Sequence, residues 1–311
     1  MNYSLIDQDD QLALVCQKAR RHAAVALDTE FVRTRTYYPQ LGLIQLFDNE
    51  QLVLIDPLKI SDWSAFIELL TDTKVTKFLH AGGEDLEVFL HRFGVLPQPM
   101  IDTQILAAFE AGNMAAALSE CDNLCQRRLD ALAPEEAWRD ITNAWQLRPR
   151  QLAVLQRLAA WRLKVAREKD MAVNFVVREE HLWKVARFMP GSLGELDHLG
   201  LSGHEIRFHG KTLVALVAEA QALDESELPQ PLGNLIDHPH YKQVFKAMKA
   251  LVQQVSEESG FSQELLASRR QINQVLSQHW GLKPQGRLPE LLTGWRGELL
   301  KPGIDKILAD V

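Results

Sequence analysis

Hydrophobic and polar positions alternate in three short segments near the start of the chain. Segments 23–32, 40–48 and 51–57 are rich in Val, Ile and Leu and have the length of β-strands. Only Asn49 and Glu50 separate the last two segments, as in a β-hairpin. The pattern therefore predicts a three-stranded antiparallel meander.

Helical spacing of apolar residues replaces this alternation further along the chain. It predicts a helix over residues 61–70, with Ser61 or Asp62 as the N-cap. The short apolar run 75–81 follows that helix and predicts a parallel crossover strand. Strands and helices that follow one another in this way indicate an α/β domain.

Two more helices complete this first part of the chain. Apolar residues at helical spacing predict one helix over 83–94. Another is predicted after Ile101, with Asp102 or Thr103 as its cap. Residues 1–112 are accordingly interpreted as α/β.

From Asn113 onward the chain shows helical patterns and an internal repeat. Two pairs of segments match, 155–189 with 245–280 and 190–220 with 286–310. The stretch 224–240 between the repeats is rich in proline and acidic residues, as linkers are. The pattern predicts two tandem helical bundles.

Composition excludes several classes of protein. The 311 residues, 46% hydrophobic and 24% charged, do not fit a disordered, collagen-like or disulfide-stabilised chain. Three cysteines without partners at zinc-finger spacing fit a reducing cytosol. No apolar run approaches the roughly 18 residues of a membrane helix, and the acidic start does not resemble a signal peptide. The sequence therefore predicts a cytoplasmic protein without a membrane partner.

The net charge of −7 is unevenly distributed. Residues 1–112 hold 9 Lys and Arg against 16 Asp and Glu, whereas residues 138–187 hold 11 against 5. This asymmetry suits an acidic site for cations joined to a basic surface for nucleic-acid phosphates. An alternative is that the charged helices only present solvated faces. The candidate phosphate-binding residues are Arg148, Arg150, Arg157, Arg162, Lys164 and Arg167.

Acidic residues of the first part form a candidate metal site. Asp28 and Glu30 lie two positions apart in an apolar strand and so project to one face, where a cation would balance their charge. A strand end with two solvated acids is the alternative. Asp85 begins a predicted helix, as an N-cap or as a further oxygen ligand for Mg²⁺ or Mn²⁺. Asp102 is interpreted mainly as a cap, with an outer role at the metal site as the alternative.

Motifs for other chemistries are absent from the sequence. It contains no G-x-S-x-G, no P-loop and no G-x-G-x-x-G after a strand. Hydrolysis by a metal-bound water is the remaining candidate chemistry.

Three stretches of the sequence, ALDTEFVRTRTYYPQLGLIQLFD, KFLHAGGEDLEVF and IDTQILAAF, resemble the ribonuclease D family of DEDD 3′–5′ exonucleases. The resemblance implies a ribonuclease H-like exonuclease domain with a mixed sheet over residues 1–125. It also implies two all-α HRDC domains, over 138–223 and 241–311, joined by the linker 224–240.

The resemblance also implies the activity. Members of this family trim the 3′ ends of tRNA precursors and other structured RNAs, and four carboxylates bind two divalent ions, Mg²⁺ or Mn²⁺. Asp28 and Glu30 match the first motif and Asp85 matches the second. RNA is therefore the expected partner, and no protein partner can be inferred.

The third motif of the family is missing from this chain. It is a Tyr or His four residues before an Asp, and only Tyr3 with Asp7 has that spacing, ahead of the first predicted strand. The chain resembles the family on both sides of a join near Gly112 and Asn113, so the exonuclease domain is shortened there. Impaired turnover is expected, and a non-catalytic protein that binds RNA through its HRDC domains is the alternative function.

Overall fold

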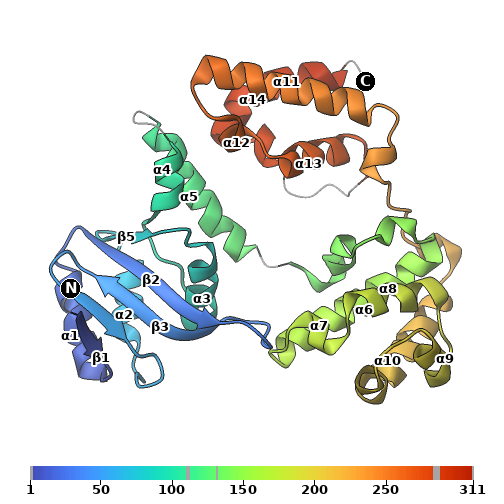
Figure 1. The fold of residues 1–311 in the computed structure, drawn as a ribbon, viewed down its shortest axis with the longest axis horizontal. Coiled ribbons are helices and arrows are strands. Elements are labelled where there is room, and N and C mark those ends of the chain that lie inside the picture. The colour runs from blue at the N-terminus through green and yellow to red at the C-terminus, as the bar shows by residue number, and fades with distance from the viewer. Residues whose placement is uncertain (1–2, 110–112, 131, 283–287, 310–311) are drawn as a thin grey trace. The chain divides into compact units, whose positions relative to one another are not determined.

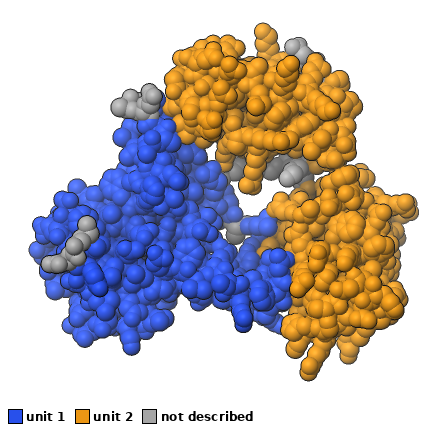
Figure 2. Space-filling view, viewed as in Figure 1, with its two compact units in different colours: residues 1–132, 165–175 blue, residues 133–164, 176–311 orange. Residues whose placement is uncertain are grey.

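The computed structural model describes residues 3–109, 113–130, 132–282 and 288–309. Gly112, one side of the predicted join, lies outside the described residues. The chain divides into two compact units (Figure 2). Unit 1 comprises residues 1–132 and 165–175, and unit 2 comprises residues 133–164 and 176–311.

A six-stranded mixed sheet forms the centre of unit 1, with the order β1-β4-β3-β2-β5-β6. The strands are β1 (Tyr3–Ile6), β2 (Ala24–Val32), β3 (Gln40–Phe47), β4 (Leu52–Ile55), β5 (Thr76–Leu79) and β6 (Met100–Asp102). Strands β2, β3 and β4 pair antiparallel, and β5 pairs parallel with β2. The predicted meander and crossover strand are therefore confirmed.

Helices pack against one face of this sheet, as Figure 1 shows for α2 and α3. The helices of unit 1 are α1 (Asp9–Ala19), α2 (Ser64–Thr71), α3 (Gly83–Phe93), α4 (Thr103–Ala108) and α5 (Met114–Leu129). Helix α3 ends at Gly94 with a left-handed φ of 72°, as the sequence indicated. The N-cap of α2 is Trp63, so the prediction of Ser61 or Asp62 as the N-cap was wrong. Asp62 lies in the turn before the helix and accepts a hydrogen bond from the Ser64 amide.

The opposite face of the sheet has no helical layer among the described residues. Strand alternation and register place every second side chain of each strand on it, and most of these are apolar outside β2. None of them belongs to the core cluster on the helical side. We call this surface the open face, and its apolar members are Tyr3, Leu5, Leu43, Phe47, Leu52, Leu54, Phe78 and Ile101.

Unit 2 contains the two predicted repeats as helical bundles. The first has α6 (Pro149–Glu168), whose last residues belong to unit 1, with α7 (Val173–Val176), α8 (Glu179–Phe188), α9 (Leu193–His198) and α10 (Gly203–Gln221). The second has α11 (Tyr241–Ser259), α12 (Gln263–Leu266), α13 (Arg269–His279) and α14 (Gly294–Ala309). Short 3₁₀ turns cover Pro134–Asp140, Ala144–Gln146, Glu225–Glu227, Leu235–Asp237 and Glu290–Leu292.

A buried carboxylate holds the first bundle together. Glu205 accepts hydrogen bonds from the Arg178 amide at 3.0 Å, the Ser202 amide and hydroxyl at 2.7 Å each, and His181 Nδ1 at 2.9 Å. Burial alone would raise the pKa of Glu205, but these bonds lower it to about 2. Since the folded pKa lies below the ordinary 4.5, the carboxylate stabilises the fold fully above that pH. This contribution is lost as the pH falls through about 2.

Glu205→Gln is expected to destabilise the first bundle by about 1–3 kcal/mol at neutral pH, since buried donors lose a charged acceptor. Urea unfolding followed by circular dichroism measures the difference from the wild type. That difference should shrink as the pH is lowered from 4.5 towards about 2. Glu195→Gln is the matched control, because Glu195 also caps a helix but is exposed. A difference that is constant with pH would contradict the assigned role.

Candidate active site

Asp28 and Glu30 lie on the open face, in the second half of β2. Both are exposed, whereas Thr29 between them is buried on the other side. The sequence correctly placed the two carboxylates on one face, but they are solvated and not buried. Gln45 on β3, directly opposite Asp28, donates a hydrogen bond from Nε2 to Asp28 Oδ2 at 2.9 Å. This bond fixes one oxygen of Asp28.

Asp85 meets β2 at Thr29, the residue between those two acids. Strand β5 pairs with β2 only along Ala24–Ala26, so the β2 edge beyond Ala26 has no strand partner on that side. The Thr29 amide at 3.0 Å and the Thr29 hydroxyl at 2.5 Å both donate to Asp85 Oδ1. The first turn of α3 is thereby anchored to the acidic part of β2.

Burial has the largest effect on the pKa of the Asp85 carboxyl. It raises the pKa of that carboxyl, and the negative charge of Asp28 raises it further. The hydrogen bonds from Thr29 oppose this rise and do not cancel it. A cation between Asp85 and Asp28 would lower the pKa, so the pair is arranged to favour a positive ligand.

Asp102 positions the loop that leads into α3. Its carboxylate caps α4 by accepting from the Gln104 amide at 2.8 Å. It also accepts from the amides of Ala81 at 3.1 Å and Gly82 at 2.9 Å. The predicted cap is confirmed, and the second pair of bonds makes Asp102 a support for the turn before Asp85.

The chemistry of Asp28, Glu30 and Asp85 fits a divalent ion, but their number does not. Carboxylate oxygens are the donors that Mg²⁺ and Mn²⁺ prefer. Among the described residues, however, no three His, Cys, Asp or Glu side chains lie close enough together to hold an ion. The structure brings Asp85 close enough to Asp28 for the two charges to interact, but the three carboxylates do not form a metal-binding group.

Two arginines that sequence reasoning missed lie beside this site. Arg33, at the end of β2, pairs with both oxygens of Glu87 on α3, at 2.8 and 3.0 Å. Arg128 on α5 pairs with the same carboxylate at 3.1 Å. They are far apart along the chain, so no spacing could have indicated their meeting. Together they fix α3 and hence Asp85.

The structure corrects one of the predicted phosphate-binding residues, Arg162, and gives Arg150 a local partner. Arg162 is only 7% exposed and donates to the Val177 carbonyl at 3.2 Å. Arg150 donates to carbonyl oxygens at the end of α10, including that of Leu223. Arg162 is therefore unavailable to RNA, whereas Arg150 is half-buried and uses only its Nη1 atom in these bonds.

Three more of these residues have local partners. Lys164 forms an ion pair with Glu135 at 2.9 Å. Arg167 donates to the Leu132 carbonyl at 2.7 Å, and Arg157 to the Ala153 carbonyl at 3.5 Å. Arg148 is exposed and forms no side-chain hydrogen bond with any described residue. The structure therefore does not join the six into one free basic surface.

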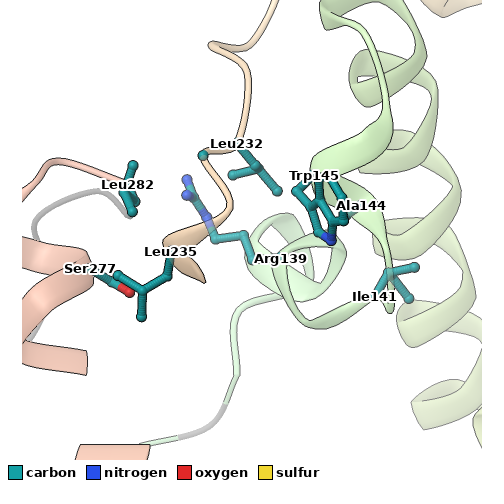
Figure 3. A pocket seen from close by; sticks show the side chains of 9 residues that line it. Arg139, Ile141, Ala144, Trp145, Leu232, Leu235, Ser277 and Leu282 are labelled. Atoms are coloured by element: carbon teal, nitrogen blue, oxygen red, sulfur yellow. The ribbon is translucent and has the colours of Figure 1, made fainter. Parts of the chain in front are cut away.

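A small cavity in unit 2 has the wrong lining for hydrolysis. It has a volume of about 170 Å³, and apolar side chains such as Ile141, Leu232 and Leu282 form most of its wall (Figure 3). Arg139 and Ser277 supply polar groups, but no carboxylate lines it. The acidic end of β2 remains the candidate active site. No described helix is both long and apolar enough to span a bilayer.

Three family models match the chain in series. They are "3'-5' exonuclease" over residues 3–156, "HRDC domain" over 151–217, and "Ribonuclease D, C-terminal HRDC domain" over 239–304. Similar proteins include ribonuclease D of Serratia proteamaculans, 58% identical with 99% of each chain covered. Ribonuclease D of Escherichia coli is 55% identical, with 100% of this chain and 99% of the relative covered.

Solved structures agree with these matches. The crystal structure of Escherichia coli RNase D, described as an exoribonuclease involved in structured RNA processing, superposes with a TM-score of 0.94. It covers 100% of this chain and 99% of the other at 55% identity. The catalytic core of RRP6 from Trypanosoma brucei, with a TM-score of 0.54 at 17% identity over 71% of this chain, shares the fold alone.

The alignments also bear on the missing segment. The match to the Escherichia coli protein runs over 372 positions, whereas this chain has 311 residues. At least 61 aligned positions therefore have no residue in this chain. This chain is therefore shorter than such relatives, which agrees with the predicted shortening.

Proposed function

The chain belongs to the ribonuclease D family of 3′–5′ exoribonucleases, and on that premise we propose that it shortens tRNA precursors and other structured RNAs from their 3′ ends. The exonuclease domain is assigned to residues 1–125, and the HRDC domains to 138–223 and 241–311, with 224–240 as the linker. RNA is the partner expected of the family, and tRNA precursors with 3′ extensions are the proposed substrates.

One observation carries this proposal for the site. Asp85 reaches β2 at Thr29, between the two exposed carboxylates of Asp28 and Glu30. Asp85, which is remote in sequence from the other two acids, is thus held beside the strand that carries them. This supports their assignment as the metal ligands, although they do not converge fully.

Divalent ions, when bound, activate a water molecule and stabilise the leaving oxygen of the phosphodiester. Asp28 and Asp85 are the residues proposed to hold them, with Glu30 as the third ligand. The chain's own residues prepare these carboxylates. Gln45 orients Asp28, Thr29 orients Asp85, and the Asp102 bonds fix the turn before α3.

A non-catalytic RNA-binding protein is the less supported alternative. Identity of 55–58% to ribonuclease D over nearly the whole length favours the enzyme. The three cysteines are free thiols, in keeping with the proposed cytoplasmic location. The lost segment removes one metal ligand and the group that orients water, so we propose that the chain turns over slowly.

The test is incubation of the purified chain with a 3′-extended tRNA transcript and Mg²⁺. Stepwise shortening from the 3′ end is expected, and a chelator should stop it. Asp28→Asn should reduce the rate at least about 100-fold, since a metal ligand is lost. Asp7→Asn, which removes an exposed carboxylate of the same unit, is the matched control and should leave the rate unchanged.

Mn²⁺ titration separates a weak site from a misassigned one. Binding in about the 10⁻⁴–10⁻³ M range is expected for so few carboxylates, and Asp28→Asn should abolish it. Equal affinity in the variant would show that the ligands are elsewhere. A salt-sensitive RNA complex without any shortening would support the non-catalytic alternative.

A further inference from the structure

Three exposed lysines lie on α11 of the second bundle. Residues 241–254 contain three lysines and no acidic residue. Lys242, Lys246 and Lys249 are all exposed, and their spacing places them on one side of the helix. None of the three forms an ion pair with any residue that the structure describes. The stripe is therefore uncompensated.

A fourth cation adjoins this stripe. Helix α13 packs against α11, and the Arg269 guanidinium lies 5.7 Å from the centre of the Phe245 ring. Phe245 immediately precedes Lys246 on α11, on the flank of the helix that turns towards the core. Arg269 is thus held next to the lysines by its aromatic contact. We call Lys242, Lys246, Lys249 and Arg269 the basic face.

This arrangement opposes local electrostatics. Arg269 and Arg270 occupy the first turn of α13, where the helix dipole disfavours cations. The matching turn of the first bundle, at the start of α8, instead carries Glu179 and Glu180, which the dipole favours. Lysines one turn apart on α11 also repel each other. An anionic ligand would relieve all of these interactions at once.

We propose that the basic face binds the phosphate backbone of the RNA substrate. Lys242 and Lys249 are seven residues apart, or about 10 Å along the helix axis. One strand of a nucleic-acid helix presents roughly three phosphates over that length. Arg269 contacts the Phe245 ring, and the adjacent Tyr241 is only 5% exposed, so neither of these rings is free to stack on a base. Binding is therefore independent of sequence, and this inference rests on the proposed exoribonuclease function.

The experiment compares the full chain with K242Q/K246Q/K249Q in binding a fluorescein-labelled tRNA transcript. Anisotropy is measured in chelator, so that no RNA is hydrolysed. Losing three phosphate contacts should reduce the steepness of the fall of log K, where K is the binding constant, with log salt concentration by about 2. Raising salt from about 50 to 200 mM should then cost the wild type about 20-fold more affinity than the variant.

Two control variants make the outcome specific. K18Q/K59Q/K74Q removes the same charge from exposed lysines of unit 1 and should bind like the wild type. K242R/K246R/K249R keeps the charge and should also retain binding. If both Gln triple variants weaken binding equally, only net charge matters and the proposal is overturned.

Failure of this proposal is distinguishable from failure of the proposed function. Wild-type affinity and salt slope in K242Q/K246Q/K249Q would overturn the basic face, while Mg²⁺-dependent shortening by the wild type would still stand. Loss of shortening with a normal, charge-dependent RNA complex would overturn only the enzymatic role.

Discussion

Inserting the missing segment between Gly112 and Asn113 should raise the rate of 3′ shortening by about 10²- to 10⁴-fold. This segment is the one that the Escherichia coli relative contains and this chain lacks. A positioned group that orients the attacking water contributes about that factor. The segment would also return the fourth carboxylate, which the charge of two ions requires. Single-turnover rates on one 3′-extended tRNA transcript measure the gain.

The control is the same insertion with the Tyr or His and the Asp of its third motif changed to Phe and Asn. This version should repair the packing of the exonuclease domain without restoring the rate. If the uninserted chain already shortens RNA as fast as the inserted one, the described carboxylates suffice. The missing motif would then not limit the rate.

Much of unit 1 was predictable because short-range sequence patterns specify its strands and turns. Alternation in β2 and β3, with a two-residue connection to β4, fixed the meander and put Asp28 and Glu30 on one face. Strand β1 and helix α1 were missed. Only Ile6 of β1 is buried, and its partner β4 lies almost 50 residues away, so the strand leaves little local signal.

Side-chain partners from distant segments account for what the sequence could not show. Arg162 looked like a surface cation, yet it is buried and donates to the carbonyl of Val177, which follows a different helix. The Asp85 contact depends on where β5 ends, because a longer β5 would occupy the edge at Thr29. Neither fact follows from residue spacing on one element.

Self-association through the open face is the second large effect that we expect. Both faces of the sheet are apolar, but only one is covered by helices among the described residues. Tyr3 is 63% exposed, Leu5 56% and Phe47 42%, which is unusual for neighbours on one sheet. A bare surface of a few hundred Å² at about 25 cal/mol per Å² forfeits several kcal/mol. That is a large share of the roughly 5–15 kcal/mol that stabilises a domain.

Unit 1 should therefore unfold at a lower temperature than unit 2, and the chain should bind a hydrophobic dye. A second copy is the partner we expect on the open face, because two identical apolar surfaces can cover each other. Calorimetry of the full chain measures the two unfolding temperatures, and sedimentation measures the self-association.

Leu5→Lys with Phe47→Lys should make the chain monomeric, since charges would have to be buried in the dimer. Leu58→Lys is the matched control, because Leu58 is 84% exposed but lies outside the sheet. It should leave association unchanged. The segment insertion should also abolish association, because its helices would cover the same apolar side chains. The opposite result would be a monomeric wild type that unfolds in one cooperative transition and binds no dye. It would show that the open face is stable in water. The lost segment would then not affect the stability of the domain.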